Sequence, residues 1–170
     1  MLAKRCPQCG TSKVRLAPRR TLLDRIFRAF TIYPLRCQLC TYRFRSFLGR
    51  PSANPRRSYE RVAVQYPVWF QSSFTRASEG LGYPGTITNL SIRGCRVRSA
   101  TPIPKGASLR LEFQPSPYDL PITIDGAVVR SQAGNAVGLR FVTVCRDEER
   151  RLRHLLEPRL SGSRFDERRH

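Results

Sequence analysis

The sequence predicts a mainly β protein: a six-stranded antiparallel barrel with a C-terminal helix, preceded by a small four-cysteine module. Six short segments rich in β-branched and aromatic residues, separated by turn residues, follow one another between residues 62 and 144. This spacing is typical of closed antiparallel barrels. A helical pattern follows the segments, and two Cys-x-x-Cys pairs precede them. The 170 residues allow one domain of ordinary size and a small module.

The N-terminal module, residues 1–49, carries the strongest metal-binding pattern in the chain. Cys6 and Cys9 form one pair and Cys37 and Cys40 the other, in a C-x2-C-x27-C-x2-C array. Zinc prefers four thiolates in a tetrahedron, and a two-residue gap lets one tight turn supply two of them. A closed four-cysteine site has no open position for substrate, so we predict a structural Zn2+ here.

The two knuckles, "RCPQCGTSKVR" and "LRCQLCTYRF", resemble those of a zinc ribbon. The chain departs from that family at Thr41, because a glycine commonly follows the last cysteine and relieves the turn there. The 27-residue gap also exceeds the common separation of about 15 to 20 residues.

Within that gap, the stretch "TLLDRIFRAF" predicts a short amphipathic helix with Thr21 as its N-cap. Its apolar stripe consists of Leu22, Leu23, Ile26, Phe27 and Phe30. Such stripes usually pack on their own protein. Because Arg25 and Arg28 lie on the other face, docking on an anionic membrane surface or on a partner is the alternative interpretation.

Residues 50–56 are rich in proline, glycine and small polar residues and are interpreted as a linker to a second domain, residues 57–157. The period-2 alternation of this domain puts the following residues on the core face: Leu109, Leu111, Phe113, Val137, Leu139 and Phe141. The stretch "RDEERRLRHLLEP" predicts a helix that closes one end of the barrel through Leu152, Leu155 and Leu156. We expect residues 158–170 to be disordered.

The net charge of +19 is concentrated at the N-terminal end. Residues 1–57 hold fourteen lysines and arginines and a single acid, Asp24, a net charge of +13. A surface of this kind attracts nucleic acid, anionic lipid or nucleotide phosphates, or is simply a solvated face.

Other sequence features limit the classes of protein to which the chain can belong. No apolar run reaches about 18 residues, so no transmembrane segment is expected. The six cysteines follow no secretory signal, which favours reduced thiols or metal ligands and a cytoplasmic location. The two histidines have no matching nucleophile motif, so we do not expect an enzyme.

Two motifs flank the first predicted strands of the second domain. Arg57 and Arg61 are four residues apart, a spacing that puts both side chains on one side of the backbone, and "NLSIRG" supplies Asn89, Ser91 and Gly94. Together they resemble the Arg-x-x-x-Arg and Asp/Asn-x-Ser-x-x-Gly motifs of the PilZ domain family. The resemblance covers roughly residues 56 to 157.

The resemblance implies a barrel that binds the bacterial second messenger cyclic di-GMP, often as an intercalated dimer of the ligand. Arg57 and Arg61 would clamp a phosphate or guanine, with Arg56 assisting. The remaining implied contacts are Asn89, Ser91 and Gly94. The chain would then be a non-enzymatic receptor that signals to a downstream protein partner.

Two alternatives remain at this stage. The arginines could pair with acids on the barrel while "NLSIRG" forms an ordinary turn. Alternatively, the chain is a zinc-ribbon protein that binds nucleic acid through its basic N-terminal module, with the barrel degenerate or only a scaffold.

Overall fold

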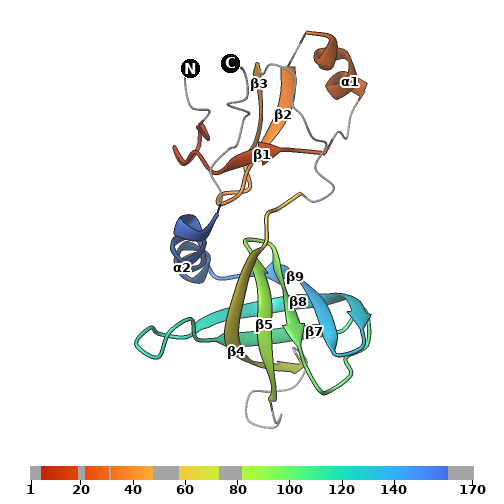
Figure 1. Cartoon of the computed structure of the whole chain (residues 1–170), viewed down its shortest axis with the longest axis vertical. Helices are drawn as coiled ribbons and strands as arrows, with labels where there is room; N and C mark the ends of the chain where they lie inside the picture. Colours follow the sequence, from red (N-terminus) through yellow and green to blue (C-terminus); the bar gives the residue numbers. More distant parts are fainter. Residues whose placement is uncertain (1–4, 19–21, 31, 48–57, 73–81, 161–170) are drawn as a thin grey trace, which may run out of the picture. The chain divides into compact units, whose positions relative to one another are not determined.

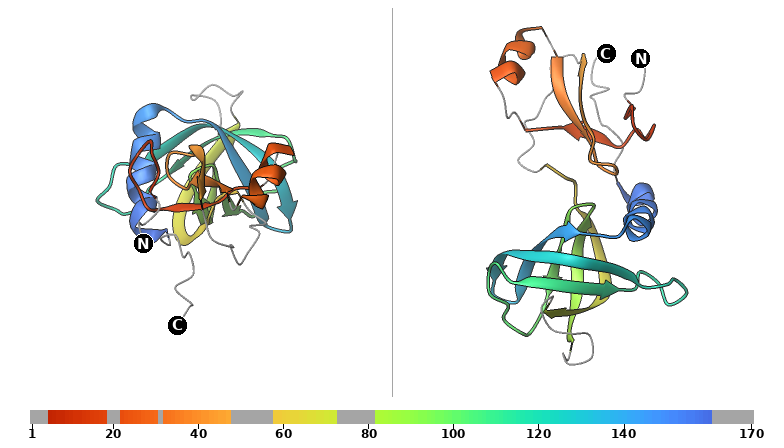
Figure 2. Two further views of the ribbon diagram at one scale, coloured as in Figure 1. Left: turned by 90° about the horizontal axis from the view of Figure 1, so that it is seen from above. Right: turned by 180° about the vertical axis from the view of Figure 1, so that it is seen from behind.

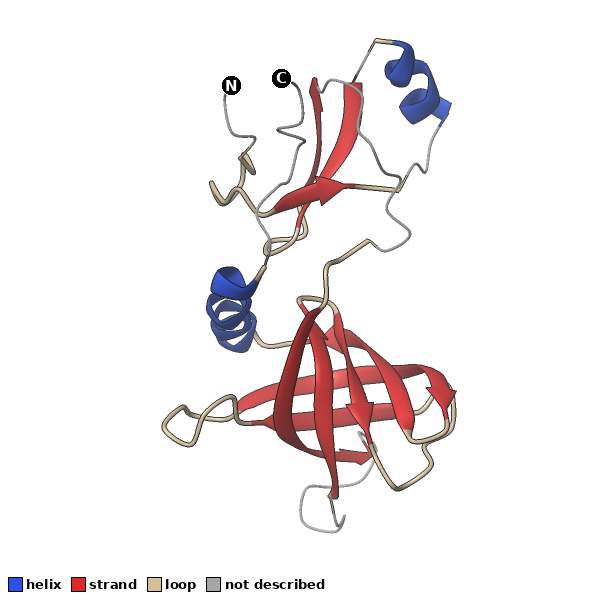
Figure 3. Cartoon of the chain, in the orientation of Figure 1, coloured by secondary structure: helices blue, strands red, loops and turns tan. Residues whose placement is uncertain are grey.

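The computed structural model describes residues 5–18, 22–30, 32–47, 58–72 and 82–160. Its contacts divide the chain into two compact units. The first comprises residues 1–60 and 157–170, and the second comprises residues 61–156. Strands predominate in both, as Figures 1 and 3 show. None of the described helices is long and apolar enough to cross a membrane.

The first unit is built on an antiparallel sheet of three short strands. β1 (Val14–Leu16), β2 (Ile32–Cys37) and β3 (Arg43–Phe47) lie in that order, with β2 in the centre. The small core consists of Val14, Ala17, Tyr33, Leu35, Leu39 and Leu160 with the buried cysteines Cys6 and Cys37. So few apolar side chains bury little surface, and a module of this size depends on other interactions for stability.

The helix expected between the knuckles is present as α1 (Leu22–Ala29), but the prediction that its apolar stripe packs on the protein is wrong. Leu22, Leu23, Ile26 and Phe30 are 74%, 53%, 56% and 64% exposed, and Phe27 is half-buried. The buried position is Asp24. Thr21, the predicted N-cap, lies outside the described residues.

The orientation of α1 follows from the charge on Asp24. Its carboxylate accepts hydrogen bonds from Arg43 at 2.6 Å and from Arg45 at 3.4 Å, both on β3. The Arg45 guanidinium also lies over the Phe27 ring, 5.1 Å from its centroid. Because a buried carboxylate is costly unless it is paired, these contacts turn the polar side of α1 toward the sheet.

The second unit is a closed antiparallel barrel, as predicted (Figures 1 and 2). Its strands follow the order β4-β5-β6-β9-β8-β7 around the barrel. Their bounds are β4 Val62–Ser72, β5 Tyr83–Ser91, β6 Gly94–Arg98, β7 Ser108–Phe113, β8 Ile122–Ala133 and β9 Ala136–Thr143.

The predicted core face of the barrel is confirmed. The alternating residues of β7 and β9 named above are all buried, whereas Arg110, Glu112 and Arg140 between them are exposed. Residues opposite one another in neighbouring strands share a face, as Val68 and Phe113 do between β4 and β7. Both are buried in the interior.

The predicted C-terminal helix is α2 (Arg146–Leu156), and it packs beside β8. Leu152 and Leu156 are fully buried and Leu155 is half-buried. The Glu148 carboxylate accepts the Thr123 N–H at 3.3 Å and so ties the first turn of α2 to β8.

The expectation of disorder from residue 158 onward is wrong for residues 158–160. A 3-10 turn, η1 (Glu157–Arg159), follows α2, and Leu160 is buried. Its carbonyl accepts a hydrogen bond from Lys13 Nζ at 2.8 Å. A single apolar residue makes no periodic pattern, which is why the sequence did not indicate this contact. Residues 161–170 lie outside the described part of the chain.

Candidate functional site

The four predicted metal ligands come together in the first unit. The sulfur of Cys6 lies 3.5 Å from that of Cys40, and the sulfur of Cys9 lies 3.6 Å from that of Cys37. All four sulfurs lie within 4.8 Å of one another. A tetrahedron with Zn–S bonds of about 2.3 Å has sulfurs about 3.8 Å apart, so this donor set fits zinc in number, chemistry and spacing.

The two knuckles have the same backbone geometry although their sequences differ. The N–H of Cys6 donates to the Thr11 carbonyl at 2.8 Å, and the N–H of Cys37 donates to the Tyr42 carbonyl at 2.9 Å. In each knuckle the residue after the second cysteine has a left-handed backbone, with φ of 71° at Gly10 and 64° at Thr41. Glycine adopts this conformation without strain, whereas a β-branched residue does not.

The thiols of the second knuckle are poor acids in the absence of a cation. Burial raises the pKa of Cys37 to about 11 and also raises the pKa of Cys40. Burial acts in the same direction on Cys6, but hydrogen bonds from the N–H groups of Cys9 and Gln8 outweigh it and lower the Cys6 pKa. Metal binding at this cluster would therefore release protons.

The "NLSIRG" stretch forms the tight connection between β5 and β6. Ser91 is paired with Gly94, and its buried hydroxyl donates to the Gly94 carbonyl at 2.9 Å. Asn89 is paired with Arg96 on β6 and with Ala63 on β4. The register shifts beside Asn89 in both pairings, an irregularity that re-aims side chains at the edge of a barrel.

Arg61 lies at the same end of these strands. The residue after it, Val62, is paired with Leu90, so the register puts Arg61 level with Ser91. The positive charge of Arg61 also acts on the buried thiol of Cys95 in β6. Burial raises the pKa of Cys95 to about 12, and the Arg61 guanidinium opposes that rise. The structure thus brings Arg61, Asn89, Ser91 and Gly94 to one end of β4, β5 and β6.

The other two predicted arginines, Arg56 and Arg57, lie outside the described residues. The family comparison extends over this region, because the family model for the PilZ domain matches residues 55–157. This is more than half of the chain. The chain belongs to the PilZ domain family.

Several solved structures are similar to this chain. The PilZ domain of YcgR from Escherichia coli, solved with c-di-GMP, has a TM-score of 0.47 and 17% identity over 62% of this chain and 92% of its own. The Bacillus subtilis inhibitor of motility MotI/DgrA has a TM-score of 0.46 and 20% identity over 66% and 51%. The PilZ domain of CeSA from a cellulose-synthesizing bacterium has a TM-score of 0.44 and 12% identity over 56% and 93%. A search of curated proteins finds no match.

Gly94 of the PilZ motif has a structural reason to be glycine. A Cβ built on it would overlap the carbonyl oxygen of Leu139 and would lie 3.3 Å from the Arg140 Cα, both in β9. Gly94 is paired with Arg140, so the absence of a side chain lets β6 and β9 approach one another. With the Ser91 hydroxyl engaged by the Gly94 carbonyl, these two residues hold the hairpin in shape.

Arg96 is the residue of this PilZ domain that sequence reasoning missed. It stands opposite Asn89, is exposed on the outer face of the barrel, and forms no ion pair within the described part of the chain. The signal was present in "CRVR", where arginines alternate with the buried Cys95 and Val97. The alternation indicated the outer face, but only the strand pairing puts Arg96 beside Asn89.

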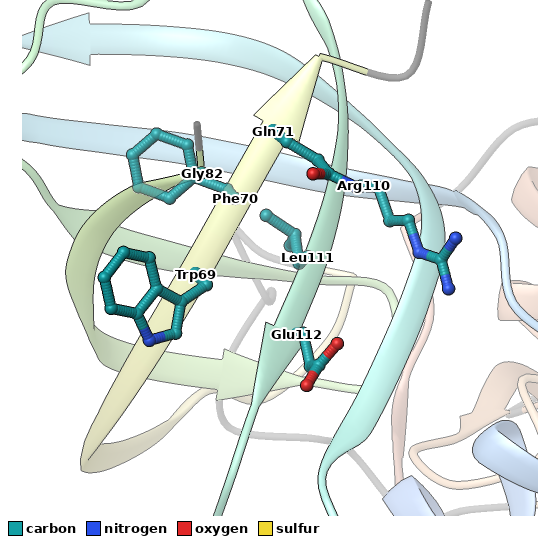
Figure 4. A pocket seen from close by; sticks show the side chains of 7 residues that line it. All are labelled: Trp69, Phe70, Gln71, Gly82, Arg110, Leu111 and Glu112. Atoms are coloured by element: carbon teal, nitrogen blue, oxygen red, sulfur yellow. The ribbon is translucent and has the colours of Figure 1, made fainter. Parts of the chain in front are cut away.

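A separate shallow pocket of about 80 Å³ lies at the other end of β4 (Figure 4). Its lining residues are Trp69, Phe70, Gln71, Gly82, Arg110, Leu111 and Glu112. Sites for small molecules enclose about 300 to 1,000 Å³, so this pocket is too small for a dinucleotide. The PilZ motifs are therefore the stronger candidate site.

Proposed function

We propose that this PilZ domain binds cyclic di-GMP and that the chain is a non-enzymatic receptor for this bacterial second messenger. Both PilZ motifs are intact in the matched region. The observation that carries the proposal is the register of β4, β5 and β6, which brings Arg61 and the hairpin of Asn89 to Gly94 to one end of the barrel. A receptor for an intracellular messenger would act in the cytoplasm.

The chemistry of the ligand suits these residues. Cyclic di-GMP presents two phosphates and two guanines, and a guanidinium holds either a phosphate or the guanine O6 and N7 through paired hydrogen bonds. It also stacks flat on a purine. In this proposal Arg57 and Arg61 clamp the ligand, and Arg56 adds a third cation.

In this proposal some residues of the hairpin contact the ligand and others support the hairpin. Asn89 offers an amide that reads a guanine edge, and Arg96, paired with it in the sheet, adds a fourth cation. Ser91 and Gly94 would support these contacts, since their hydrogen bond and close packing fix the hairpin.

For the N-terminal module we propose a structural zinc held by Cys6, Cys9, Cys37 and Cys40. The sulfur separations of 3.5 and 3.6 Å support this ion, as does the presence of four thiols without an open ligand position. When bound, the metal supplies folding free energy, on the order of 10 kcal/mol in zinc-finger peptides. The small core of this unit makes such a contribution necessary.

Calorimetry with cyclic di-GMP at two salt concentrations tests the receptor proposal. We expect saturable binding with a modest dependence on salt, because a dinucleotide displaces few counterions. The competing function is nucleic-acid binding by the basic N-terminal module, which would instead weaken steeply with salt. A zinc-loaded protein that gives no heat with cyclic di-GMP refutes the receptor proposal.

A further inference from the structure

Residues 58–60 separate the two arginines of the PilZ Arg-x-x-x-Arg motif, and all three belong to the first unit. They lie against the second cysteine knuckle and the strand that leads into it. Their partners there are Gln38 and Arg36, and a further partner is Arg15 on β1.

Gln38 makes the most specific of these contacts. It lies between the metal ligands Cys37 and Cys40, and it is only 2% exposed. Its Oε1 accepts the Glu60 N–H at 2.6 Å, and its Nε2 donates to the Arg36 carbonyl at 3.2 Å and to the Ser58 carbonyl at 3.5 Å. A buried amide bonded at both ends is held firmly, because a broken bond would leave a polar group unsatisfied.

The side chains of residues 59 and 60 add further contacts. Arg36 Nη1 donates to the Tyr59 hydroxyl at 3.1 Å, and its guanidinium lies 5.2 Å from the centroid of the Tyr59 ring. The Glu60 carboxylate lies 3.7 Å from Arg15 on β1. The whole spacer of the motif is therefore bonded to the sheet and the knuckle of the zinc module.

We propose that the second knuckle, through Gln38, forms a docking surface for residues 58–60, which we call the seat. Metal binding at the four cysteines would order this surface and so hold the arginine motif in the conformation that binds its ligand. Gln38 is then a positioning residue, and loss of the metal lowers the affinity for cyclic di-GMP. This inference rests on the proposed function. It adds regulation by metal to that function, through Gln38, which lies outside both PilZ motifs.

The expected loss of ligand affinity follows from the fraction of molecules in which residues 58–60 are bound to the knuckle. A ligand that binds only the seated conformation has an apparent affinity proportional to the seated fraction. If the loss of Gln38 leaves the spacer seated about one tenth of the time, affinity falls about tenfold. The effect acts through the order of the spacer, so it should be visible without any ligand.

The test compares Gln38→Ala with Gln8→Ala in the zinc-loaded full chain. Gln8 is an exposed glutamine in the first knuckle, and its substitution is a matched control. We expect hydrogen exchange at the Glu60 amide to accelerate at least about tenfold in Gln38→Ala, and cyclic di-GMP binding to weaken about tenfold. Gln8→Ala should change neither. Gln38→Glu keeps an acceptor for the Glu60 N–H and should retain most of the protection.

Zinc content is measured for each variant, so that a loss of metal is not mistaken for a loss of the seat. Unchanged exchange in Gln38→Ala would overturn the proposal. Faster exchange with unchanged cyclic di-GMP affinity would also overturn it, because the seat would then have no bearing on the ligand. A wild-type protein that binds no cyclic di-GMP refutes the proposed function instead, and the exchange data still decide whether the seat exists.

A second inference comes from α1, independently of the ligand. We infer that its exposed apolar stripe binds an anionic membrane surface. Three of the exposed residues, Leu22, Leu23 and Ile26, lie within an arc of about 100° when successive residues are about 100° apart. The fourth, Phe30, follows the last residue of the helix. The anionic lipid is indicated by charge, since residues 1–57 carry +13 and their single acid, Asp24, is paired with β3.

The vesicle test again has a matched control within the chain. Leu22→Asp with Ile26→Asp changes the stripe, and Tyr118→Asp with Leu120→Asp makes the same change in charge at side chains that are 98% and 76% exposed on the loop after β7. We expect the wild type and the loop variant to sediment with phosphatidylcholine vesicles that contain about one third phosphatidylglycerol. The stripe variant should bind at least about tenfold more weakly.

Equal binding by the stripe variant would show that charge alone attracts the protein, and would overturn this inference. Absence of wild-type binding to the vesicles would also overturn it. The stripe would then bind a second copy of the chain, which sedimentation without vesicles would show, or a protein partner. Insertion is checked with Phe30→Trp in a Trp69→Phe background, since Trp69 is the only tryptophan. Lipids brominated in the acyl chain should quench its fluorescence.

Discussion

The left-handed residues that follow the two knuckles lead to a paired prediction. Thr41 has a φ of 64°, and Gly10 occupies the equivalent place in the first knuckle with a φ of 71°. Exchanging the residue types should therefore have opposite effects. Thr41→Gly should strengthen the metal-bound fold, and Gly10→Thr should weaken it.

The magnitudes follow from the backbone. A left-handed conformation costs a residue with a side chain about 1 to 2 kcal/mol, and glycine returns about 0.5 to 1 kcal/mol of this through its greater entropy in the unfolded chain. Thr41→Gly should thus stabilise the module by about 0.5 to 1 kcal/mol. A Cβ at Gly10 meets no atom within 4 Å, so the only cost of Gly10→Thr is that of holding threonine in the left-handed backbone conformation. This substitution should lower the stability of the module by about 1 kcal/mol.

Competition with a chelator measures both effects, because zinc affinity includes the folding free energy of the module. A change of about 1 kcal/mol alters the zinc dissociation constant about fivefold. Thr41→Asn is a useful third variant, since asparagine tolerates the left-handed region and keeps a polar side chain. Equal zinc affinities for the wild type, Thr41→Gly and Gly10→Thr would refute the view that backbone strain limits this module.

Four further predictions concern the ligand site, the barrel and α1. Arg57→Ala and Arg61→Ala should each weaken cyclic di-GMP binding by about 1.5 to 3 kcal/mol in calorimetry, and wild-type affinity in both variants would mean that the site is assigned wrongly. Gly94→Ala should lower barrel stability by about 1 to 3 kcal/mol in denaturant unfolding because the methyl group overlaps β9. An unchanged midpoint with lost ligand binding would instead give this glycine a direct role at the ligand. Asp24→Asn should destabilise the first unit by about 1 to 2 kcal/mol, since its partners are partly exposed, and the loss should shrink at high salt. Burial raises the pKa of Cys95 from 9.0 to about 12, so the folded thiol keeps its proton where the unfolded one loses it. The unfolding free energy should therefore be unaffected below pH 9 and fall between pH 9 and 12 by up to about 1.4 kcal/mol per pH unit, a slope that Cys95→Ala should remove.

Some of these features follow from local patterns in the chain. The alternation of β7 and β9 placed their core residues correctly, because successive side chains of a strand point to opposite faces wherever the strand lies. The acids at the start of α2 and the cysteine pairs are equally local. The motifs around Arg61 and Asn89 predicted the family in the same way, since each is a short stretch with its own spacing.

Other features depend on contacts between distant residues, and the sequence could not reveal them. The stripe of α1 predicted burial, but the pairing of Asp24 with two arginines of β3 turned the helix the other way. Gly94 was expected to contact the ligand because of its motif, and its close approach to the backbone of β9 became visible only in the structure.

Apart from the three strands of the first unit, the sequence alone therefore determined which segments form strands and helices, which four cysteines lie together, and which family the barrel belongs to. These properties depend on side-chain type and on spacing along the chain. Only the tertiary structure decided which face of α1 meets solvent, that Arg96 stands beside Asn89, and that Gln38 holds the spacer of the arginine motif. Each of these depends on pairing between strands or on hydrogen bonds across about 20 residues, for which no local pattern codes.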